Sequence, residues 1–504
     1  MELSGVTLNG FTCVVAFIGG LIWLGLSWNK KKKKTYHLPP GPPGWPLVGN
    51  LPEIIRLKQP FQQYAHKLHK KYGPIITLRL GFRPSIIVAS HELAYEALIH
   101  KGSIFATRPA VKGPRGKLFQ DSQANIAMAA YCLQWRTLRR NLVSETLSTS
   151  SLKSFWKGRE WGMEILLERL RNEAEQGAGV VKLIDHLRHA TLCILLYMCF
   201  GTRLEEKTVR DVEGILREIL LCLGKAEFDD FFPVLEFLNR KRRKRLQGIR
   251  QRQMEILTEL INRRRAVLAE GKEEECRAYI DTLLCLRVED GRGLNDDQMV
   301  TLCTEFLNAG TDTTSTTLQW LMANLVKDEG IQSKLYEEIV NVVGKEKAVE
   351  EEDVSKMVYV EAVVKETLRR HPPGQFVLGH AVTEASTVGG YDVPADAIIN
   401  FAVWEMGNDP QVWENPDEFR PERFLSDEVD LTGSREIKLM PFGVGRRICP
   451  GIALAMMHVQ LVVARLVQEF VWESKPGEPV DLTEVQEFTI VMKNPLHAVI
   501  KQRD

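Results

Sequence analysis

The loop around one cysteine limits which kind of bound group this chain can fold around. Cys449 follows Gly443 and Gly445, comes two residues after Arg447, and stands just before an apolar helix predicted over 452–470. The free N–H groups and the dipole at the start of that helix favour the thiolate form of the cysteine. A thiolate can bind a metal, and the glycines let the backbone approach something flat and large. The combination is typical of a site for a large metal-containing group.

The loop has two competing interpretations. Lone cysteines are most often inert core residues, but a core position does not account for the surrounding glycines and arginine. A phosphate-binding glycine loop fails because Ile448 occupies the place of the third glycine, and no strand-to-helix βαβ context surrounds the loop. No other nucleotide-binding motif occurs in the chain.

An uncharged apolar stretch near the N-terminus predicts one membrane span. Phe11 to Trp28 contains no charged residue, and Lys30 to Lys34 follow without interruption. As a helix rising about 1.5 Å per residue, the stretch just crosses a hydrocarbon core of about 30 Å. A cleaved signal peptide is the alternative, but it would need basic residues before the apolar stretch rather than after it. We therefore expect an uncleaved anchor over 1–29, with the lysines and the rest of the chain in the cytosol.

The charge balance and the cysteines agree with a cytosolic body that does not bind nucleic acid. The 504 residues carry 66 Lys and Arg against 65 Asp and Glu, so the chain lacks the basic surplus that holds a phosphate backbone. Nine cysteines are scattered without a C-x-x-C pair, which favours free thiols over a disulfide framework or a structural zinc site. The basic run 240–245 follows the apolar segment 231–238 and is expected to contact lipid or solvent.

The order of secondary structure indicates a mainly α fold with small β-sheets. Two short β-branched runs within 74–90 predict a hairpin, and 377–400 is a second strand-rich patch. Helical periodicity covers most of 92–370. We expect three segments: an anchor over 1–29, a basic and proline-rich hinge over 30–50, and one large cytosolic domain over 51–504.

The cysteine loop matches a motif of known function. Phe442 to Gly451 reads F-x-x-G-x-R-x-C-x-G, which resembles the haem-binding loop of the cytochrome P-450 (haem-thiolate) monooxygenases. Three more motifs of that family occur in its order, and the resemblance extends from the anchor to the C-terminus. It implies the cytochrome P-450 fold over 51–504 and haem b as cofactor. Phe442 and Arg447 would bind the haem, and the Cys449 thiolate would be the axial ligand of its iron.

The second motif lies inside a long helix predicted over about 295–327. Residues 309–314 read A-G-T-D-T-T. Gly310 costs about 1 kcal/mol relative to alanine in a helix interior, so we expect a local bend there. The resemblance implies that Asp312 and Thr313 are the acid and alcohol that relay protons to iron-bound oxygen. A polar kink without chemistry is the alternative.

The third motif joins Glu366 and Arg369, three residues apart on a helix, to Arg423 in the later segment 419–424. By itself such a helical pair is a common surface feature that adds only tenths of a kcal/mol. The resemblance implies that the three side chains form a buried network that holds the haem loop in place. Such a network needs bidentate guanidinium–carboxylate pairing. An Arg369→Lys substitution should therefore weaken the network although it keeps the charge.

The fourth motif places Trp135 and Arg139 one helical turn apart on the same face. The resemblance implies that both, together with Arg447 and His380, contact the haem, whose buried propionates need cationic and N–H partners. A histidine exposed on a strand is an equally good interpretation of His380. Two further histidine pairs are expected on solvated helix faces: His66 with His69, and His186 with His189.

Together these features predict a single-span monooxygenase of the endoplasmic reticulum that inserts one atom of O2 into an apolar substrate. The chain has no flavin or nicotinamide motif, so the resemblance implies electrons from NADPH through a membrane-bound flavoprotein reductase. The motifs are most similar to those of plant microsomal members, in particular fatty-acid in-chain hydroxylases and epoxidases. The mostly apolar regions expected to line the pocket also suit a terpenoid or phenylpropanoid. These regions are 125–130, Phe306, 373–378 and 488–491.

Two other functions stay open at this point. A haem-thiolate isomerase or dehydratase of hydroperoxides would need no reductase, but such relatives usually depart from the acid-alcohol pattern that is intact at Asp312 and Thr313. The other alternative is a membrane-tethered haem binder without catalytic activity. Four intact chemical motifs argue against it.

Overall fold

The computed structural model describes residues 36–46, 48–57, 59–81, 83–110, 116, 125–225, 227–232, 237, 239–271, 276–288 and 291–503. The anchor expected over 1–29 and the lysine run after it lie outside these residues. Within them, two helices are long and apolar enough to cross a membrane, Leu183–Phe200 and Ile452–Glu469. Both contribute to the packed core, the first along almost its whole length, so they are interior helices of the fold.

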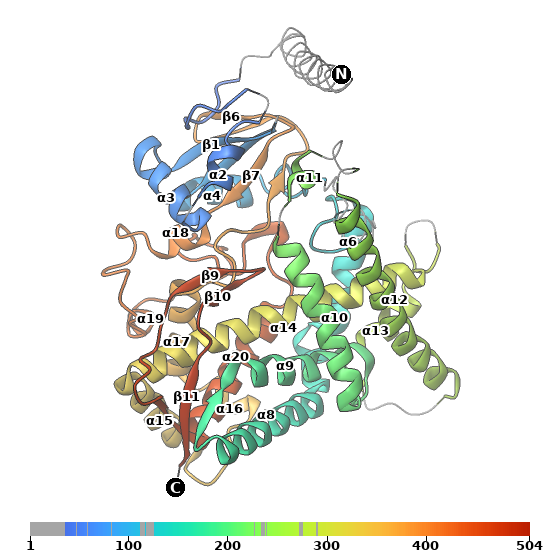
Figure 1. The fold of residues 1–504 in the computed structure, drawn as a ribbon, viewed down its shortest axis with the longest axis vertical. Helices are drawn as coiled ribbons and strands as arrows, with labels where there is room; N and C mark the ends of the chain where they lie inside the picture. Colours follow the sequence, from blue (N-terminus) through green and yellow to red (C-terminus); the bar gives the residue numbers. More distant parts are fainter. Residues whose placement is uncertain are drawn as a thin grey trace, which may run out of the picture.

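Helices form the larger part of the molecule and pack around α14 (Asp296–Lys327), which runs across its middle (Figure 1). Asn295 caps this helix: its side-chain oxygen accepts a hydrogen bond from the Gln298 N–H at 2.9 Å, and the Gln298 side chain accepts one from the Asn295 N–H at 3.0 Å. The other long helices are α3 (Phe61–Tyr72), α6 (Leu133–Asn141), α8 (Trp156–Gln176), α9 (Leu183–Phe200), α10 (Glu206–Gly224), α12 (Arg240–Ala269), α15 (Glu329–Val343), α17 (Val358–Arg370) and α20 (Ile452–Glu469). Shorter helical elements are α2 (Leu51–Ile55), α4 (His91–Tyr95), η1 (Glu96–His100), η2 (Leu142–Thr146), α7 (Thr149–Ser154), α11 (Phe228–Phe231), α13 (Tyr279–Cys285), α16 (Glu351–Val354), α18 (Val403–Gly407), α19 (Arg423–Ser426) and η4 (Gly445–Arg447).

The main sheet lies at one end of the molecule, where blue and orange segments meet (Figure 1). Its strand order is β1 (Ile75–Leu80), β2 (Arg83–Val88), β7 (Ile398–Phe401) and β4 (His380–Ala381). β1 and β2 form the predicted antiparallel hairpin, with Ile76 opposite Ile87, while β2 and β7 run parallel, with Ile86 opposite Ile399. Smaller sheets pair β3 (Val180–Lys182) and β8 (Phe470–Ser474) with β11 (His497–Gln502), β5 (Ser386–Val388) with β6 (Tyr391–Val393), and β9 (Glu484–Gln486) with β10 (Ile490–Met492). The prediction of a mainly α fold with small sheets is confirmed.

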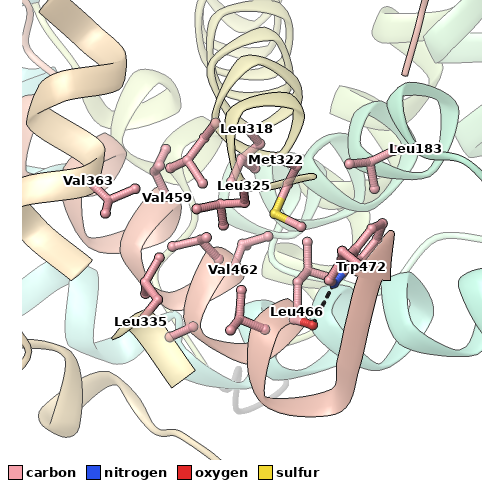
Figure 2. Close-up of a cluster of buried hydrophobic side chains, with 14 of the residues drawn as sticks. Leu183, Leu318, Met322, Leu325, Leu335, Val363, Val459, Val462, Leu466 and Trp472 are labelled. Atoms are coloured by element: carbon pink, nitrogen blue, oxygen red, sulfur yellow. Dashed lines mark hydrogen bonds between the residues drawn. The ribbon is translucent and has the colours of Figure 1, made fainter. Parts of the chain in front are cut away.

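The most extensive hydrophobic cluster of the described residues joins α9, α14, α15, α17, α20 and β8. Figure 2 shows its centre, where Leu318 and Met322 of α14 lie together with Val462 of α20. Trp472 of β8 closes one side, and its Nε1–H donates to the Leu466 carbonyl oxygen at 2.9 Å. Close packing of this kind holds α14 and α20 rigidly against each other. These two helices also flank the cavity described below.

The expectation that four histidines lie on solvated helix faces is wrong for three of them. The three are buried, and each lies against a carboxylate of another element: His69 against Glu405, His186 against Glu173, and His189 against Glu213. Helical spacing could not reveal this, because the partner residues lie elsewhere in the chain. The described residues contain no group of three or more His, Cys, Asp or Glu side chains that could hold a metal ion.

Candidate active site

A cavity of about 550 Å³ lies beside α14 and is lined by elements from many parts of the chain. Its wall includes α6, α14, α20, the loops at 125–128 and 373–378, and the loop that carries the cysteine. The residues selected from the sequence that line it are Trp135, Arg139, Thr313, His380, Phe442, Arg447 and Cys449. Asp312 and the three residues of the ionic network do not line it. The fold thus gathers most of the candidate site around one space.

Gly445 determines the path of the cysteine loop. Its φ is +70°, and a Cβ at this position would lie 2.3 Å from the Leu98 carbonyl oxygen of η1, so a larger residue does not fit. Nearer the cysteine, the Cys449 N–H donates to the Phe442 carbonyl oxygen at 2.9 Å and closes the loop. The Cys449 side chain is thereby presented to the cavity.

The surroundings of Cys449 act on its pKa in opposite directions. Burial raises the pKa of the thiol, while the Gly451 N–H and the positive charge of Arg139 lower it, and burial outweighs the other two. Contrary to the sequence-based expectation, the polypeptide alone therefore does not favour the thiolate. A coordinated metal ion deprotonates a thiol outright, so binding of the metal itself would supply the missing stabilisation.

Three arginines line the cavity: Arg139 and Arg447, which are partly buried, and Arg108, which is buried and which the sequence motifs do not single out. Burial and the charge of a neighbouring arginine lower the pKa of Arg108 to about 9 and that of Arg447 to about 10. Burial also lowers the pKa of Arg139. In the described part of the chain these side chains donate to backbone carbonyls, such as those of Leu378 and Ala106, and form no ion pair with a carboxylate. Buried cations need anions, so this donor set fits a ligand with carboxylates at its edge.

His380 is buried in the cavity wall and is not an exposed strand residue. Its Nδ1 lies 2.6 Å from the Phe105 carbonyl oxygen, which places a ring proton on Nδ1. Burial, together with the charges of Arg108 and Arg447, lowers the pKa of His380 to about 3. The imidazole is therefore neutral at physiological pH and contributes a polar ring rather than a cation.

Trp135 links the helix α6 to the loop that closes the cavity. Its Nε1–H donates to the Ile126 carbonyl oxygen at 2.8 Å, and the guanidinium carbon of Arg447 lies 4.1 Å from the centre of its ring. Arg139 comes one turn later on the same helix and also lines the cavity. Trp135 thus positions both the loop and one of the cationic donors.

Thr313 places a hydroxyl on the cavity wall. The hydroxyl donates to the Ala309 carbonyl oxygen one turn earlier at 2.6 Å, and the Ala309 side chain is exposed to the cavity. The α-helix is continuous from Asp296 to Lys327, so the expected bend does not interrupt it. A Cβ on Gly310 would lie 2.7 Å from a Leu195 methyl group of α9. The glycine therefore serves the close packing of α9 against α14.

Asp312 is adjacent to Thr313 in the chain but lies on a different side of α14. Its carboxylate accepts a hydrogen bond from the Thr489 hydroxyl at 2.7 Å, and the guanidinium nitrogens of Arg217 and Arg188 lie 3.4 Å and 3.7 Å from it. The carboxylate does not line the cavity, whereas Thr489 does. The acid is thus connected to the cavity wall through the hydroxyl of Thr489, which lies in the region 488–491 that the sequence analysis expects to line the pocket.

Glu305 is a further carboxylate on the cavity wall that the motifs do not mark. Its oxygens accept the N–H of Ile126 at 2.8 Å and the N–H of Ala127, which ties the loop at 125–128 to α14. Burial raises the pKa of Glu305 to about 7, although those two N–H groups and the nearby arginines lower it. The side chain therefore titrates near neutral pH.

A Glu305→Gln variant, uncharged at every pH, should reveal this titration. Because the folded-state pKa lies above the ordinary value of 4.5, the stability linked to the protonated carboxyl is complete below pH 4.5 and is lost as the pH rises through 7. Between pH 6 and 8 the free energy of unfolding of the native protein should fall by on the order of 1 kcal/mol relative to that of the variant. Urea unfolding of the haem-loaded proteins at several pH values measures this difference. Glu361→Gln is the control, because Glu361 pairs with Lys365 at the surface. Parallel pH profiles for the native protein and Glu305→Gln would contradict the assignment.

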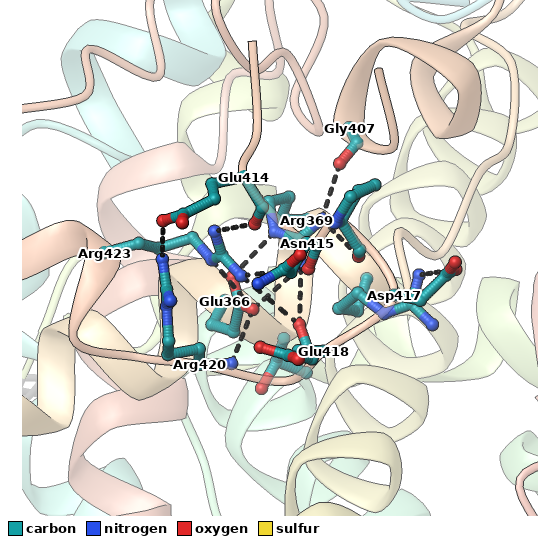
Figure 3. Close-up of polar contacts among 12 residues, drawn as sticks. Glu366, Arg369, Gly407, Glu414, Asn415, Asp417, Glu418, Arg420 and Arg423 are labelled. Carbon is teal, nitrogen blue, oxygen red and sulfur yellow. Dashed lines mark hydrogen bonds and ion pairs between the residues drawn. The ribbon is translucent and has the colours of Figure 1, made fainter. Parts of the chain in front are cut away.

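The three ionic residues form one buried network, which Figure 3 shows, and none of them lines the cavity. Glu366 and Arg369 have no exposed surface, and Arg369 donates to both Glu366 oxygens at 2.7 Å and 2.8 Å. Arg423 donates to the same carboxylate at 3.2 Å. Arg369 also donates to the carbonyl oxygens of Gly407 at 2.7 Å and Glu418 at 3.0 Å. The network thereby ties α17 to the long loop that precedes the cysteine segment.

These residues fit a flat cofactor that carries a metal at its centre and carboxylates at its edge. Cys449 would bind the metal, and Arg108, Arg139 and Arg447 would pair with the carboxylates. The small side chain of Ala309 keeps the facing surface of α14 low. Fold and site together define a haem-thiolate protein.

Comparison with known proteins agrees with this class. The family model named cytochrome P-450 matches residues 39–500. Cytochrome P-450 89A9 of Arabidopsis thaliana is 42% identical over 492 residues, which cover 93% of this chain and 94% of the relative. Isoflavone 3'-hydroxylase of Medicago truncatula is 34% identical and covers 93% of each chain. A solved zebra fish cytochrome P-450 with progesterone has a TM-score of 0.77 and 23% identity, and the match covers 88% of this chain and 100% of that one.

The chain belongs to the cytochrome P-450 family of monooxygenases. Members of this family use haem with an axial cysteine thiolate, O2 and electrons derived from NADPH.

Proposed function

We propose that this protein inserts one oxygen atom from O2 into an apolar organic substrate, with Cys449 as the axial ligand of the haem iron. The observation that carries the proposal is that Cys449 and the Thr313 hydroxyl line the same cavity. When bound, the haem supplies the activation of O2 with the electrons that reach it. The chain's own residues hold the cofactor, keep bulk water out and present hydroxyl protons at Thr313 and Thr489.

Thr313 is proposed to hold a proton at its Oγ1 for delivery inside the cavity, and a Thr313→Ala variant tests this. NADPH should still be consumed, but product should fall at least about tenfold while hydrogen peroxide rises, because proton delivery favours oxygen insertion over peroxide release. Thr311→Ala is the matched control, since Thr311 makes the same bond to the previous turn, at 2.8 Å, but does not line the cavity. Unchanged product and unchanged peroxide in Thr313→Ala would contradict the role and favour a passive haem pocket.

The substrate is proposed to be a phenylpropanoid, a terpenoid or a fatty acid. The cavity wall carries apolar side chains such as Phe306, Val377 and Phe488, which suit all three classes. The name of isoflavone 3'-hydroxylase assigns an aromatic substrate to that relative, which supports the first class. The proposal of a fatty acid rests on the similarity of the motifs to those of fatty-acid in-chain hydroxylases and epoxidases.

We also propose a single-span protein of the endoplasmic reticulum, with residues 51–504 as one cytosolic catalytic domain that receives electrons from a membrane-bound NADPH-dependent flavoprotein reductase. The uncharged stretch from Phe11 to Trp28 and the lysines after it support the anchor. Phe237 is 62% exposed and lies just before the basic start of α12 at 240–245, a combination that suits contact with anionic lipid.

Turnover of a substrate panel by the membrane-bound protein tests the proposal. The panel contains fatty acids, terpenoids and phenylpropanoids, with NADPH and added reductase, and mass spectrometry locates the inserted oxygen. Products that vanish without reductase support a monooxygenase and select the substrate class. Conversion of fatty-acid hydroperoxides without reductase would instead identify an isomerase or dehydratase. A red-shifted Soret band with carbon monoxide but no product from any compound would favour the haem-binding scaffold.

A further inference from the structure

The two carboxylate oxygens of Asp312 face different surroundings. Oδ2 accepts the hydrogen bond from the Thr489 hydroxyl at 2.7 Å. Oδ1 lies 3.4 Å from a guanidinium nitrogen of Arg217 and 3.7 Å from one of Arg188. The side chains of Arg217 and Arg188 are 28% and 18% exposed, whereas that of Asp312 is 3% exposed. One side of the buried acid therefore lies beside groups that solvent reaches, and the other side lies beside a hydroxyl on the cavity wall.

Thr313, the alcohol of the sequence motif, makes no such contact with the acid. Its hydroxyl donates to the Ala309 carbonyl oxygen at 2.6 Å, and in the described structure it forms no hydrogen bond with Asp312. Adjacent residues of an α-helix point about 100° apart, so the two side chains diverge. A proton on Asp312 can thus reach the cavity wall through one direct hydrogen bond to Thr489, whereas no direct bond joins Asp312 to Thr313.

The backbone around Thr489 holds its hydroxyl in place. Thr489 lies in the turn between β9 and β10, is 3% exposed and directly precedes the first residue of β10. That residue, Ile490, accepts a hydrogen bond from the Trp320 ring of α14 at 2.8 Å, and its N–H donates to the Pro373 carbonyl oxygen at 3.0 Å. The turn is therefore fixed to α14 one residue away from the hydroxyl that contacts Asp312.

We propose that Thr489 is a further catalytic residue, which passes protons from Asp312 into the cavity. The inference rests on the proposed function and makes Thr489, rather than Thr313, the alcohol that is paired with the acid. The Thr489 hydroxyl gives its proton to an acceptor in the cavity while its oxygen takes a proton from the protonated Asp312 carboxyl. The carboxylate then regains a proton from water on the side of Arg217 and Arg188. A hydroxyl can do both, because it has one proton to donate and two lone pairs to accept with.

Substitutions at Thr489 test the proposal in the haem-loaded membrane protein with added reductase. Thr489→Val removes the hydroxyl but keeps the branched shape, and it should form at least about fivefold less product per NADPH consumed, with more hydrogen peroxide released. Thr489→Ser keeps the hydroxyl and should behave as the native protein does. Thr483→Val is the matched control, since the Thr483 hydroxyl also bonds to a carboxylate, that of Asp481 at 2.5 Å, but lies at the surface.

Double variants distinguish the two possible alcohol partners of the acid. If Asp312 and Thr489 act in one path, adding Thr489→Val to Asp312→Asn should cause little further loss of product per NADPH. Adding Thr313→Ala to Asp312→Asn should then multiply the two losses. The reverse pattern, with Thr313→Ala silent in the Asp312→Asn background and Thr489→Val not, would overturn the proposal.

A spectroscopic measurement tests the place of the hydroxyl without turnover, and it also serves if Asp312→Asn fails to incorporate haem. The probe is carbon monoxide bound to the reduced protein, whose C–O stretching frequency responds to nearby hydroxyl dipoles. Thr489→Val should shift this infrared band, while Thr489→Ser and Thr483→Val should keep its native position. An unshifted band in Thr489→Val, or a native yield of product per NADPH, would overturn the proposal. A shifted band in a protein that forms no NADPH-dependent product from any compound would support the place of the hydroxyl and reject the proposed reaction.

Discussion

A Cys449→Ser protein is expected to lose the red-shifted Soret band with carbon monoxide and nearly all product formation. Serine keeps the size of the side chain but cannot supply the thiolate, whose electron donation favours cleavage of the O–O bond. We expect product formation to fall by more than about a thousandfold, equivalent to about 4 kcal/mol of the activation barrier. The absorption spectrum of the reduced protein with carbon monoxide and the rate of product formation measure both effects.

The described chain offers a matched control for this substitution. Cys132 is an exposed thiol at the start of α6, the helix that carries Trp135 and Arg139. Cys132→Ser should retain the native spectrum and the native rate. A Cys449→Ser protein with a thiolate-type Soret band would show that another cysteine binds the iron.

An Arg369→Lys protein is expected to be strongly destabilised although the charge is kept. Arg369 satisfies both oxygens of buried Glu366 and also donates to backbone carbonyls, and a lysine ammonium cannot reproduce this planar set of bonds. Loss of one partner from a buried ionic network costs about 3–5 kcal/mol. Urea unfolding and the fraction of expressed protein that incorporates haem measure the loss.

Arg420→Lys is the natural comparison, because Arg420 lies beside the network (Figure 3). Its side chain bonds to Glu414 at the surface, at 2.8 Å, while its backbone N–H bonds to Glu366 and is unaffected by the substitution. We expect no measurable change in stability. Equal stability of Arg369→Lys and the native protein would show that the network is dispensable for the fold.

The sequence located those site residues that occur in short local motifs. The cysteine loop, the W-x-x-x-R pair and the helix of Thr313 have fixed internal spacings, and each motif therefore stays recognisable wherever the fold places it. The direction of Asp312 follows from helix geometry, since adjacent residues point about 100° apart and Thr313 already faces the cavity. The partners of Asp312, however, come from α9, α10 and the segment at Thr489. No local spacing encodes them.

The site residues that lie outside the motifs could be identified only from the tertiary packing. Arg108 precedes a proline in a segment without periodicity, and its place on the cavity wall depends on the approach of the segment at 378–379. Glu305 reads as an ordinary polar position of a long helix. Its place in the site depends on the loop at 125–128, whose backbone N–H groups donate to its carboxylate.

The parallel pairing of β2 with β7 also governs when the protein can mature during its synthesis. At about 5–20 residues per second, roughly 15 to 60 s separate the emergence of Val88 from that of Ile398. Throughout this interval one edge of the early hairpin has no partner strand and is open to pairing with other nascent chains. Cys449 emerges later still, so haem capture comes late in maturation, after most of the chain has been made. A chaperone that shields the hairpin edge should therefore raise the yield of loaded enzyme more than added haem does.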